Sequence, residues 1–460
     1  MRKISVYADS LHQNGVRNRD RIVISASSTP EFVCAYLAIH LLGAITIPVD
    51  PASPPARFAH IADFSDPKAV ITNKDLKCEN VPIWSINDLN KADTSFRVEP
   101  QVLPGQIADI LFTSGTTGDP KGVVLTHANI YCAANNINTF IQNTAEDIEI
   151  VPLPLCHSFG LGRLRCNLLL GSTIVLIDGF SFPGRIFAAL EKWKGTGLSV
   201  VPAAIAMILR MTRNKLGDYA DQIRYIEIGS APMKLSNKQK LLQLLPKTRV
   251  CMHYGLTEAS RSTFIEFHSD HKKMENSIGK PTPGVQVKIA DINFEICPPG
   301  KLGNIFVKGG NVMKEYFRKT ADTENTVRDG WLDTGDCGFY DEQGYFYLEA
   351  REKELINVGG RKVSPKEIEN IITGLENIED CACIGIPDPN EISGEVVKCY
   401  IVSKKKDTQI DFHSLTDYLR DKIEPYKLPK FYEEIGALPK TSSGKIKRLS
   451  LKQLSQANNE

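Results

Sequence analysis

The chain reads RIVIS at residues 21–25, PEFVCAYLAIHLL at residues 30–42 and AITIPV at residues 44–49. The two short apolar runs predict buried strands, and the segment between them places its apolar residues at helical spacing. Thr29 is a suitable N-cap for this helix, and Gly43 is a suitable stop. A strand–helix–strand unit of this kind predicts an α/β fold built on a mostly parallel sheet.

The alternation of strand and helix continues along the chain, and further apolar runs predict strands at 69–72, 172–177, 198–201 and 224–229. From about residue 277, short strands and turns replace this pattern, which indicates a smaller β unit. Helices and strands then return. We therefore expect a large N-terminal domain, residues 1–352, with parallel or mixed sheets, flanking helices and the small β unit. We expect a smaller α+β C-terminal domain at residues 353–460.

The composition is that of an ordinary globular chain. Its 460 residues suit two or three domains of about 100–200 residues each. A content of 42% apolar and 24% charged residues excludes a disordered or fibrous chain. Lys and Arg total 55 against 54 for Asp and Glu, which gives a net charge of +1. This charge gives no overall attraction to nucleic acid or to an anionic membrane. The longest apolar run, at 34–49, is interrupted and shorter than the ~20 residues of a membrane-spanning helix.

The cysteines and histidines indicate a compartment but no metal. Eleven cysteines are scattered along the chain, and no secretory signal is visible at its start. Reduced thiols in a cytoplasmic protein fit this pattern. His268, Asp270 and His271 lie close together without a thiol nearby, and a surface loop explains them better than zinc. We expect a cytoplasmic protein with no integral membrane segment, no nucleic-acid partner and no structural zinc.

The most informative stretch is TSGTTGDPKG at residues 113–122, which follows the apolar run ILF. Glycines let backbone N–H groups approach an anion, hydroxyls add donors, and a lysine supplies positive charge. The Gly-Lys-Ser/Thr of a Walker loop is absent, and a Gly/Thr-rich surface turn is the alternative interpretation. The predicted phosphate-binding residues of this stretch are Thr113, Ser114, Gly115, Thr116, Thr117, Gly118 and Lys121.

This stretch resembles the signature loop of the adenylate-forming superfamily, which includes acyl- and aryl-CoA ligases. Four further segments resemble the superfamily's motifs in the same order: YGLTE at 254–258, WLDTGD at 331–336, REKELINVGGRKVSP at 351–365 and PKTSSGKIKR at 439–448. Alone, each short motif is more typical of an ordinary turn. Together they span nearly the whole chain and imply the superfamily's fold, with a mobile C-terminal domain. Full-length relatives carry about 40 more residues at the start, so we expect the N-terminal domain to lack that segment.

The resemblance implies a site for ATP and Mg²⁺. Tyr254 would stack on adenine, Glu258 would bind the metal, and Asp336 would accept hydrogen bonds from two ribose hydroxyls. These roles suit the side chains, because Mg²⁺ prefers one or two carboxylates beside phosphate oxygens. Arg351 would give directed hydrogen bonds to ribose or phosphate oxygens. The other residues that the resemblance places at the nucleotide are Gly229, Ser230, Ala231, Pro232, Gly255 and Thr257.

The resemblance also implies the reacting groups. Lys445 would be the catalytic lysine that binds the substrate carboxylate and the α-phosphate, and Thr257 would place a hydroxyl on the phosphate. His157, in PLPLCHSFG, would gate the acyl pocket; a packed turn histidine is the alternative for it. The residues implied for the second step are the hinge Lys353 and the thiol-side loop residues Gly359 and Gly360, which would replace Lys445.

The neighbourhood of His157 bears on the substrate. Amino-acid-activating relatives usually carry an aspartate here, whereas residues 152–160 hold no carboxylate, which favours a plain carboxylic acid. Arg163 and Arg165 depart from the apolar run usual at this point, and we expect them to face water or a partner.

The predicted function is ATP-dependent, AMP-forming activation of a fatty or aryl acid to an acyl adenylate, followed by thioester formation with coenzyme A. One alternative acceptor is the phosphopantetheine of an acyl or peptidyl carrier protein. A luciferase-like oxidative enzyme and a non-enzymatic binding module are the alternatives from other classes. The presence of Asp336, Arg351 and Lys445 argues against the binding module.

Overall fold

The computed structural model describes residues 2–76, 78, 81–91, 102–113, 120–351, 354–358, 361–389, 395–404, 410–441 and 444–457. It divides into two compact units: Met1–Val287 with Val307–Leu332, and Lys288–Phe306 with Asp333–Glu460. Much of the expected small β unit thus clusters with the C-terminal segment, while the domain boundary between 352 and 353 stays a prediction. Within the described residues, no helix has both the length and the apolar character that crossing a bilayer requires.

The first unit contains a seven-stranded sheet whose strands are, in spatial order, β16 (Glu315–Tyr316), β6 (Lys121–Thr126), β5 (Ile107–Thr113), β2 (Ile45–Pro48), β1 (Arg21–Ser25), β3 (Ala69–Thr72) and β4 (Ile83–Ser85). Strands β1 to β5 pair in parallel, and β6 and β16 run antiparallel to their neighbours. Helices α1 (Arg2–Gln13), α3 (Pro55–Ser65) and α9 (Thr320–Thr326) belong to the same unit.

The predicted strand–helix–strand unit forms the centre of this sheet. Helix α2 (Pro30–Leu41) connects β1 to β2, and its N-cap Thr29 accepts the N–H of Phe32 at 3.4 Å. Gly43 ends the helical segment with a left-handed φ of 69°. Residues that carry a side chain rarely adopt this backbone conformation. The parallel β1–β2 pair confirms the α/β fold that the sequence predicts.

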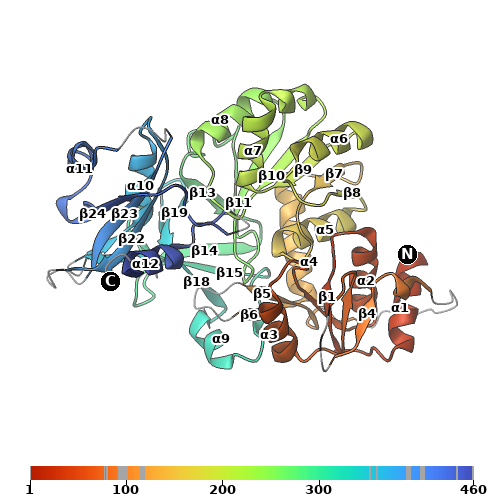
Figure 1. The fold of residues 1–460 in the computed structure, drawn as a ribbon. Coiled ribbons are helices and arrows are strands. Elements are labelled where there is room, and N and C mark those ends of the chain that lie inside the picture. The colour runs from red at the N-terminus through yellow and green to blue at the C-terminus, as the bar shows by residue number, and fades with distance from the viewer. Residues whose placement is uncertain are drawn as a thin grey trace. The chain divides into compact units, whose positions relative to one another are not determined.

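The second sheet of this unit runs in the order β13 (Ser277–Pro281), β12 (Thr263–Glu266), β11 (Arg249–Tyr254), β10 (Tyr225–Ile228), β9 (Gly197–Val200), β7 (Ile148–Val151) and β8 (Thr173–Leu176). Strands β7 to β11 pair in parallel, and β12 and β13 are antiparallel. The helices are α4 (His127–Ile141), α5 (Ser158–Leu170), α6 (Pro183–Trp193), α7 (Pro202–Thr212) and α8 (Leu235–Leu244). Helices α4 and α5 pack together between the two sheets (Figure 1).

The second unit is built mainly from antiparallel strands. Its strands include β18 (Trp331–Tyr340), β19 (Phe346–Arg351), β20 (Ile356–Val358), β21 (Arg361–Val363), β22 (Ile378–Pro387), β23 (Glu395–Ser403) and β24 (Phe431–Glu434), with β14 (Val285–Ala290), β15 (Gly303–Gly309) and β17 (Val327–Arg328) at the division of the units. Its helices are α10 (Pro365–Thr373), α11 (Phe412–Arg420) and α12 (Arg448–Ala457). Ser364 caps α10 by accepting the N–H of Glu367 at 3.4 Å, so the helix begins within the sequence Ser-Pro-Lys-Glu at residues 364–367.

Candidate active site

Several predicted site residues lie outside the described part of the chain: Ser114, Gly115, Thr116, Thr117, Gly118, Lys353, Gly359 and Gly360. For Arg351 the structure describes the backbone alone. The others fall into one group in each unit. The first unit holds Thr113, Lys121, His157, Gly229, Ser230, Ala231, Pro232, Tyr254, Gly255, Thr257 and Glu258, and the second unit holds Asp336, Arg351 and Lys445.

Most of the first group lies where parallel strands end. Tyr254 is the last residue of β11, residues 229–232 follow β10, and His157 lies between β7 and α5. Because these strands are parallel, their carboxyl ends share one edge of the sheet. Open α/β sheets bind their ligands at this edge, and the fold brings these separate motifs to it.

The strands on either side of the glycine-rich loop hold its two ends together. Thr113 ends β5 and Lys121 begins β6, and the two are register partners in an antiparallel pair. The Thr113 hydroxyl donates to the Lys121 carbonyl at 3.4 Å. The Lys121 ammonium lies 3.1 Å from the Asp322 carboxylate and 4.9 Å from the centre of the Tyr316 ring. The loop lysine is thus held by two side chains from another part of the unit.

Glu258, the predicted metal ligand, belongs to the same cluster. The Tyr316 hydroxyl donates to Glu258 Oε1 at 2.9 Å, and the Glu258 carbonyl accepts the N–H of Met313 at 2.7 Å. Burial, reinforced by the charge of Glu258, raises the pKa of Tyr316 far above its ordinary value, so the phenol stays a neutral donor. A carboxylate oriented by a hydrogen bond to one oxygen is a hard oxygen ligand of the kind that Mg²⁺ prefers.

The strip at residues 229–232 packs against a residue that the sequence did not single out. A Cβ on Gly229 would lie 2.0 Å from Cε1 of His253, so a larger residue does not fit without movement. His253 directly precedes Tyr254, its side chain is buried, and its Nδ1 lies 2.8 Å from Glu227 Oε1. Ser230 adopts a left-handed φ of 77°, which is costly for a non-glycine residue.

The expectation that Arg163 and Arg165 face water or a partner is wrong. Arg163 is 0% exposed, and its Nε and Nη2 donate to both oxygens of Glu149 at 2.7 and 2.6 Å. Its Nη1 lies 3.1 Å from Glu227. Arg165 donates to the buried carboxylate of Asp109. Arg163 is fully buried and the Arg165 side chain is 11% exposed, and in both cases a carboxylate compensates the lost hydration.

Arg261 connects the buried charges to the first turn of α5. Its Nε donates to Glu227 at 3.1 Å, while Nη1 and Nη2 donate to the carbonyls of Ser158 and Phe159 at 3.1 and 3.0 Å. Burial alone would raise the pKa of Glu227, but the charges of Arg261 and Arg163 outweigh it and hold that pKa well below its ordinary range. An ionised Glu227 therefore anchors the helix that follows His157.

His157 occupies the N-cap position of α5, and its side chain is 55% exposed. Its Nε2 lies 3.7 Å from Asp50 Oδ2. The Asp50 carboxylate raises the pKa of His157, and the histidine in turn lowers the pKa of Asp50. An exposed side chain paired with a carboxylate argues against the alternative that His157 is a packed turn histidine.

In the second unit, Asp336 on β18 and Arg351 on β19 are antiparallel register partners. The pairing brings these two positions opposite each other although fifteen residues separate them in sequence. Asp336 is 3% exposed, and its N–H donates to the Thr334 hydroxyl at 3.1 Å. The two residues predicted for the ribose thus lie on adjacent strands of one hairpin.

Lys445 lies in a hydrogen-bonded turn of the second unit. The N–H of Thr441 donates to the Lys445 carbonyl at 2.8 Å, and the N–H of Lys445 donates to the Thr441 hydroxyl at 3.1 Å. Gly444 adopts a left-handed φ of 85° within this turn. The backbone is therefore restrained while the Lys445 side chain is exposed on its own unit.

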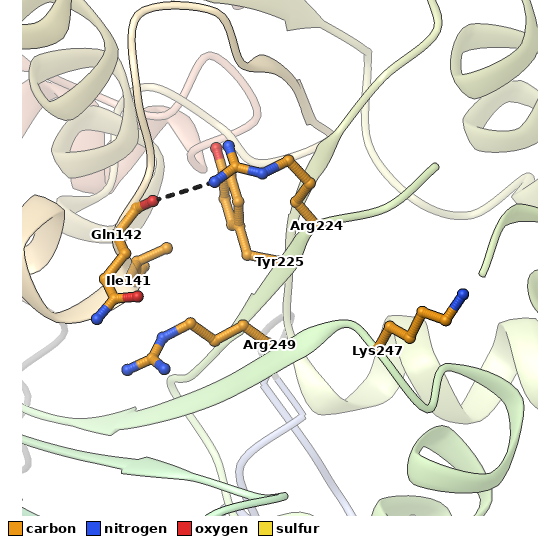
Figure 2. Close-up of a pocket in the computed structure, with 6 residues that line it drawn as sticks. All are labelled: Ile141, Gln142, Arg224, Tyr225, Lys247 and Arg249. Atoms are coloured by element: carbon orange, nitrogen blue, oxygen red, sulfur yellow. Dashed lines mark hydrogen bonds between the residues drawn. The ribbon is translucent and has the colours of Figure 1, made fainter. Parts of the chain in front are cut away.

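A pocket of about 350 Å³ lies elsewhere in the first unit, and Figure 2 shows its lining by Ile141, Gln142, Arg224, Tyr225, Lys247 and Arg249. Arg224 precedes β10 and Arg249 begins β11, so this pocket lies at the amino ends of the strands, opposite the edge that holds Tyr254. Its cations have partners, since Arg224 donates to Asp147 at 2.6 Å and Lys247 to Asp221 at 2.9 Å. The third cation, Arg249, donates to the Phe140 carbonyl at 3.1 and 2.9 Å.

Two family models match the chain. The model described as AMP-binding enzyme matches residues 2–317, and the model described as AMP-binding enzyme C-terminal domain matches residues 367–445. Among curated relatives, a feruloyl-CoA synthase of Amycolatopsis sp is 31% identical over 97% of this chain and 91% of its own length. A long-chain-fatty-acid–CoA ligase of Bacillus subtilis is 30% identical over 96% and 86%.

Solved structures show the same similarity. o-Succinylbenzoate CoA synthetase from Bacillus subtilis, in complex with its acyl-adenylate intermediate, is 28% identical with a TM-score of 0.87, covering 98% of this chain and 91% of that one. The same relative has been solved with ATP and a magnesium ion, at a TM-score of 0.87. A double mutant of it, bound to a product analogue, has a TM-score of 0.72 over 98% of this chain.

Proposed function

Because the chain belongs to the AMP-binding enzyme family, we propose that the residues gathered at the carboxyl ends of β7, β10 and β11 activate a plain carboxylic acid. The enzyme is an ATP-dependent, AMP-forming acid–CoA ligase that uses ATP, Mg²⁺ and coenzyme A. The observation that carries the residue assignment is the convergence of Tyr254, Gly229 and His157 on one edge of a parallel sheet. Three motifs from distant parts of the sequence share an edge that such folds use for ligands.

Tyr254 and the 229–232 strip are proposed to hold adenine. Tyr254 is an aromatic residue at a strand end. The tight turn after it needs a glycine at position 255, because a Cβ added there would lie 2.4 Å from the backbone nitrogen of Arg261. Thr257 supplies a hydroxyl to phosphate in this proposal. Asp336 and Arg351, which pair across one hairpin, are proposed to bind the ribose.

Glu258 is the proposed ligand for Mg²⁺, whose charge neutralises phosphate oxygens when it is bound. The residues fit this ion: a carboxylate already oriented by Tyr316 is a hard oxygen donor, and one or two such donors suffice when phosphate supplies the rest. Thr113, Lys121 and the loop residues 114–118 are proposed to hold the phosphates of ATP. The 3.4 Å hydrogen bond between Thr113 and Lys121 supports this, because it fixes the two ends of that loop.

Lys445 is the proposed catalytic lysine. The substrate carboxylate attacks the α-phosphorus of ATP, an acyl–phosphate bond forms and pyrophosphate leaves. Negative charge redistributes over the α-phosphate as this happens, and a positioned ammonium stabilises it. An exposed lysine on a restrained turn suits that task. The thiol of coenzyme A then attacks the acyl carbonyl and releases AMP, a step for which Lys353, Gly359 and Gly360 remain the proposed hinge and loop.

Coenzyme A is the acceptor that the similar proteins support. The two curated relatives are named for CoA thioester formation, whereas no observation favours a carrier protein. His157 is proposed to gate the acyl group, and the absence of a carboxylate in residues 152–160 supports an acid without an α-ammonium group. The eleven free cysteines support a cytoplasmic enzyme.

A panel of acids graded in length and aromaticity tests the proposal. With ATP and Mg²⁺, pyrophosphate release and the mass of the AMP-linked product would identify the acid. Lys445→Ala is expected to slow adenylate formation about 100–1,000-fold, the usual effect of removing one stabilising group, while ATP binding by calorimetry stays within a few fold.

Lys447→Ala is the matched control, since Lys447 is an exposed lysine two residues away. It is expected to keep the activity of the unsubstituted chain. Equal pyrophosphate release from the Lys445 and Lys447 variants would refute the assignment of the catalytic lysine. A failure of every acid in the panel to give an adenylate would refute the proposed reaction itself.

A further inference from the structure

Three side chains that are typical metal ligands meet beside α5. Asp50 follows β2 in the first sheet, whereas Cys156 and His157 directly precede α5. One ligand atom from each lies within 4.8 Å of the other two, and His157 Nε2 is 3.7 Å from Asp50 Oδ2. More than a hundred residues separate Asp50 from the other two, so the sequence pattern could not show this cluster.

The donor set and its spacing suit zinc. Imidazole nitrogen, thiolate sulfur and carboxylate oxygen are its three usual ligands, and sites with three protein ligands keep a fourth position open. Zinc–nitrogen and zinc–oxygen bonds of about 2.1 Å at a tetrahedral angle put the two ligand atoms ~3.4 Å apart. The observed 3.7 Å needs only a small contraction. Mg²⁺, which favours oxygen ligands, does not suit a thiolate and an imidazole.

The cluster is accessible and its backbone is restrained. His157 is exposed and Asp50 is half-buried, whereas Cys156 is 8% exposed beneath them. Asp50 Oδ1 accepts the N–H of Ala52 at 2.8 Å, which leaves Oδ2 toward His157. The N–H of Leu155, next to Cys156, donates to the Ser28 hydroxyl at 2.8 Å. An ion can therefore enter from solvent without unfolding the segments that carry the ligands.

We propose that Asp50, Cys156 and His157 bind one zinc-type divalent cation, and that the bound ion inhibits the enzyme by fixing His157. The binding half of this proposal stands on the three ligands alone. The inhibition half rests on the proposed function, in which His157 gates the acyl group. The fourth coordination position is left to water or to a carboxylate of the acid.

A second thiol cluster, formed by Cys381, Cys383 and Cys399, is the natural internal comparison. Its sulfur atoms also lie within 4.8 Å of one another, but the three residues are 2%, 0% and 0% exposed in the core of the second unit. All three ligand atoms of this cluster are sulfur. Cys399→Ser therefore serves as the matched control for cysteine substitution.

Zinc binding is measured on the full reduced chain without ATP, because ATP itself binds the ion. Competition with a chromophoric zinc chelator is expected to give one site per chain. Cys156→Ser and His157→Gln should each reduce the zinc affinity more than about 100-fold, which exceeds the usual effect of losing a residue that only hydrogen-bonds to a ligand. Asp50→Asn is expected to weaken binding in the same direction. Cobalt in place of zinc should show a thiolate-to-metal charge-transfer band that Cys156→Ser lacks.

The control separates this site from the other thiols. Binding that persists in Cys156→Ser and His157→Gln, or that is lost only in Cys399→Ser, would overturn the proposal. Circular dichroism of each variant shows whether it is folded, and for a misfolded Cys156→Ser the Asp50→Asn and His157→Gln titrations carry the test.

Adenylate formation at buffered free zinc tests the inhibition half. The unsubstituted enzyme is expected to lose activity as the binding site fills, while Cys156→Ser keeps its metal-free activity at the same free zinc. Equal inhibition of both would mean that zinc acts on ATP or elsewhere, and that half would be wrong. If no acid is activated even without zinc, the proposed function fails, whereas the chelator titration still decides the binding half.

Discussion

The two arginines of α5 enter two buried networks of different composition. Arg163 contacts Glu149 and Glu227 of the second sheet, and Arg165 contacts Asp109 of the first sheet. Two residues apart on a helix, they point in different directions. The helix that carries the proposed gate at its start is therefore held to both sheets by charge, and the two attachments can be compared directly.

The networks differ in how much each depends on its arginine. Around Arg163, two carboxylates share two arginines, the other being Arg261, and Glu227 also contacts His253, whose pKa is lowered by burial. Around Arg165, the single carboxylate of Asp109 also accepts from Tyr36 at 3.1 Å and contacts His40 at 3.2 Å. Removing Arg163 breaks two buried ion pairs, whereas removing Arg165 breaks one, so the first network should lose more stability. His127, whose ring centre lies 5.1 Å from that of His40, adds a titratable side chain beside the second network.

Arg163→Met should have the largest effect. It leaves Glu149 and Glu227 buried without their shared partner, and breaking a buried ion pair typically costs about 3–5 kcal/mol. Urea unfolding should show this loss in the free energy of unfolding. Arg163→Lys is the control, because it keeps the charge without the two parallel hydrogen bonds to Glu149, and it should lose less. A loss below ~1 kcal/mol in the Met variant would contradict the comparison.

Arg165→Met should cost less, about 1–3 kcal/mol, the usual penalty for a buried group that loses one of several partners. Asp109 keeps its contacts with Tyr36 and His40 in this variant. The same urea experiment measures it, and the ranking of the two Met variants is the decisive quantity. A larger loss for Arg165 than for Arg163 would reverse the interpretation of the two networks.

Gly229→Ala tests whether the Arg163 network reaches the site. The new methyl would collide with the His253 ring and displace it from Glu227, at about 1–3 kcal/mol for an overpacked position. We expect adenylate formation to fall together with stability. The double variant Gly229→Ala with His253→Ala makes room for the methyl and should recover part of the stability. Additive losses in the double variant would show that the two residues do not interact.

The smallest effect concerns pH and the second network. Burial, with the charge of His40, lowers the pKa of His127 to about 4, against about 6.5 in the unfolded chain. Between these values the unfolded chain binds a proton that the folded chain does not, so stability falls as pH decreases from ~6.5 to ~4. His127→Gln should flatten this part of the stability–pH curve. The Glu227 carboxylate, whose pKa is lowered, should lose its contribution only below about pH 4.

The fold and the edge that holds the site could be predicted from sequence, because both follow from local pattern. The β1–α2–β2 unit follows from apolar periodicity, a capping threonine and a glycine stop. The position of Gly229 at a strand end follows from the apolar run at 224–229, whereas the strand that ends at Tyr254 comes from the structure. The predicted features depend only on residues that are neighbours in the sequence, so a single sequence is enough to predict them.

The buried networks could not be placed in the same way, although a signal was present. Glu149 lies in IEIV and Glu227 in IEIG, and each glutamate is flanked by isoleucines, although only the run at 224–229 is predicted as a strand. A charge in such a strand requires a buried partner, so two unexplained cations on an apolar helix could have been matched to them. Which partner each one finds depends on tertiary contacts. The same holds for Asp50, whose proximity to His157 arises only from the packing of β2 near α5.

The hairpin of β18 and β19 makes residue 351 depend on the register set at its turn. Because side chains alternate between the faces of a strand, one residue inserted between 341 and 345 would move residue 351 to the opposite face if the turn kept its length and β19 shifted by one residue against β18. Such an insertion would touch neither Asp336 nor Arg351. It would nonetheless separate them as completely as a substitution, in a chain that still folds.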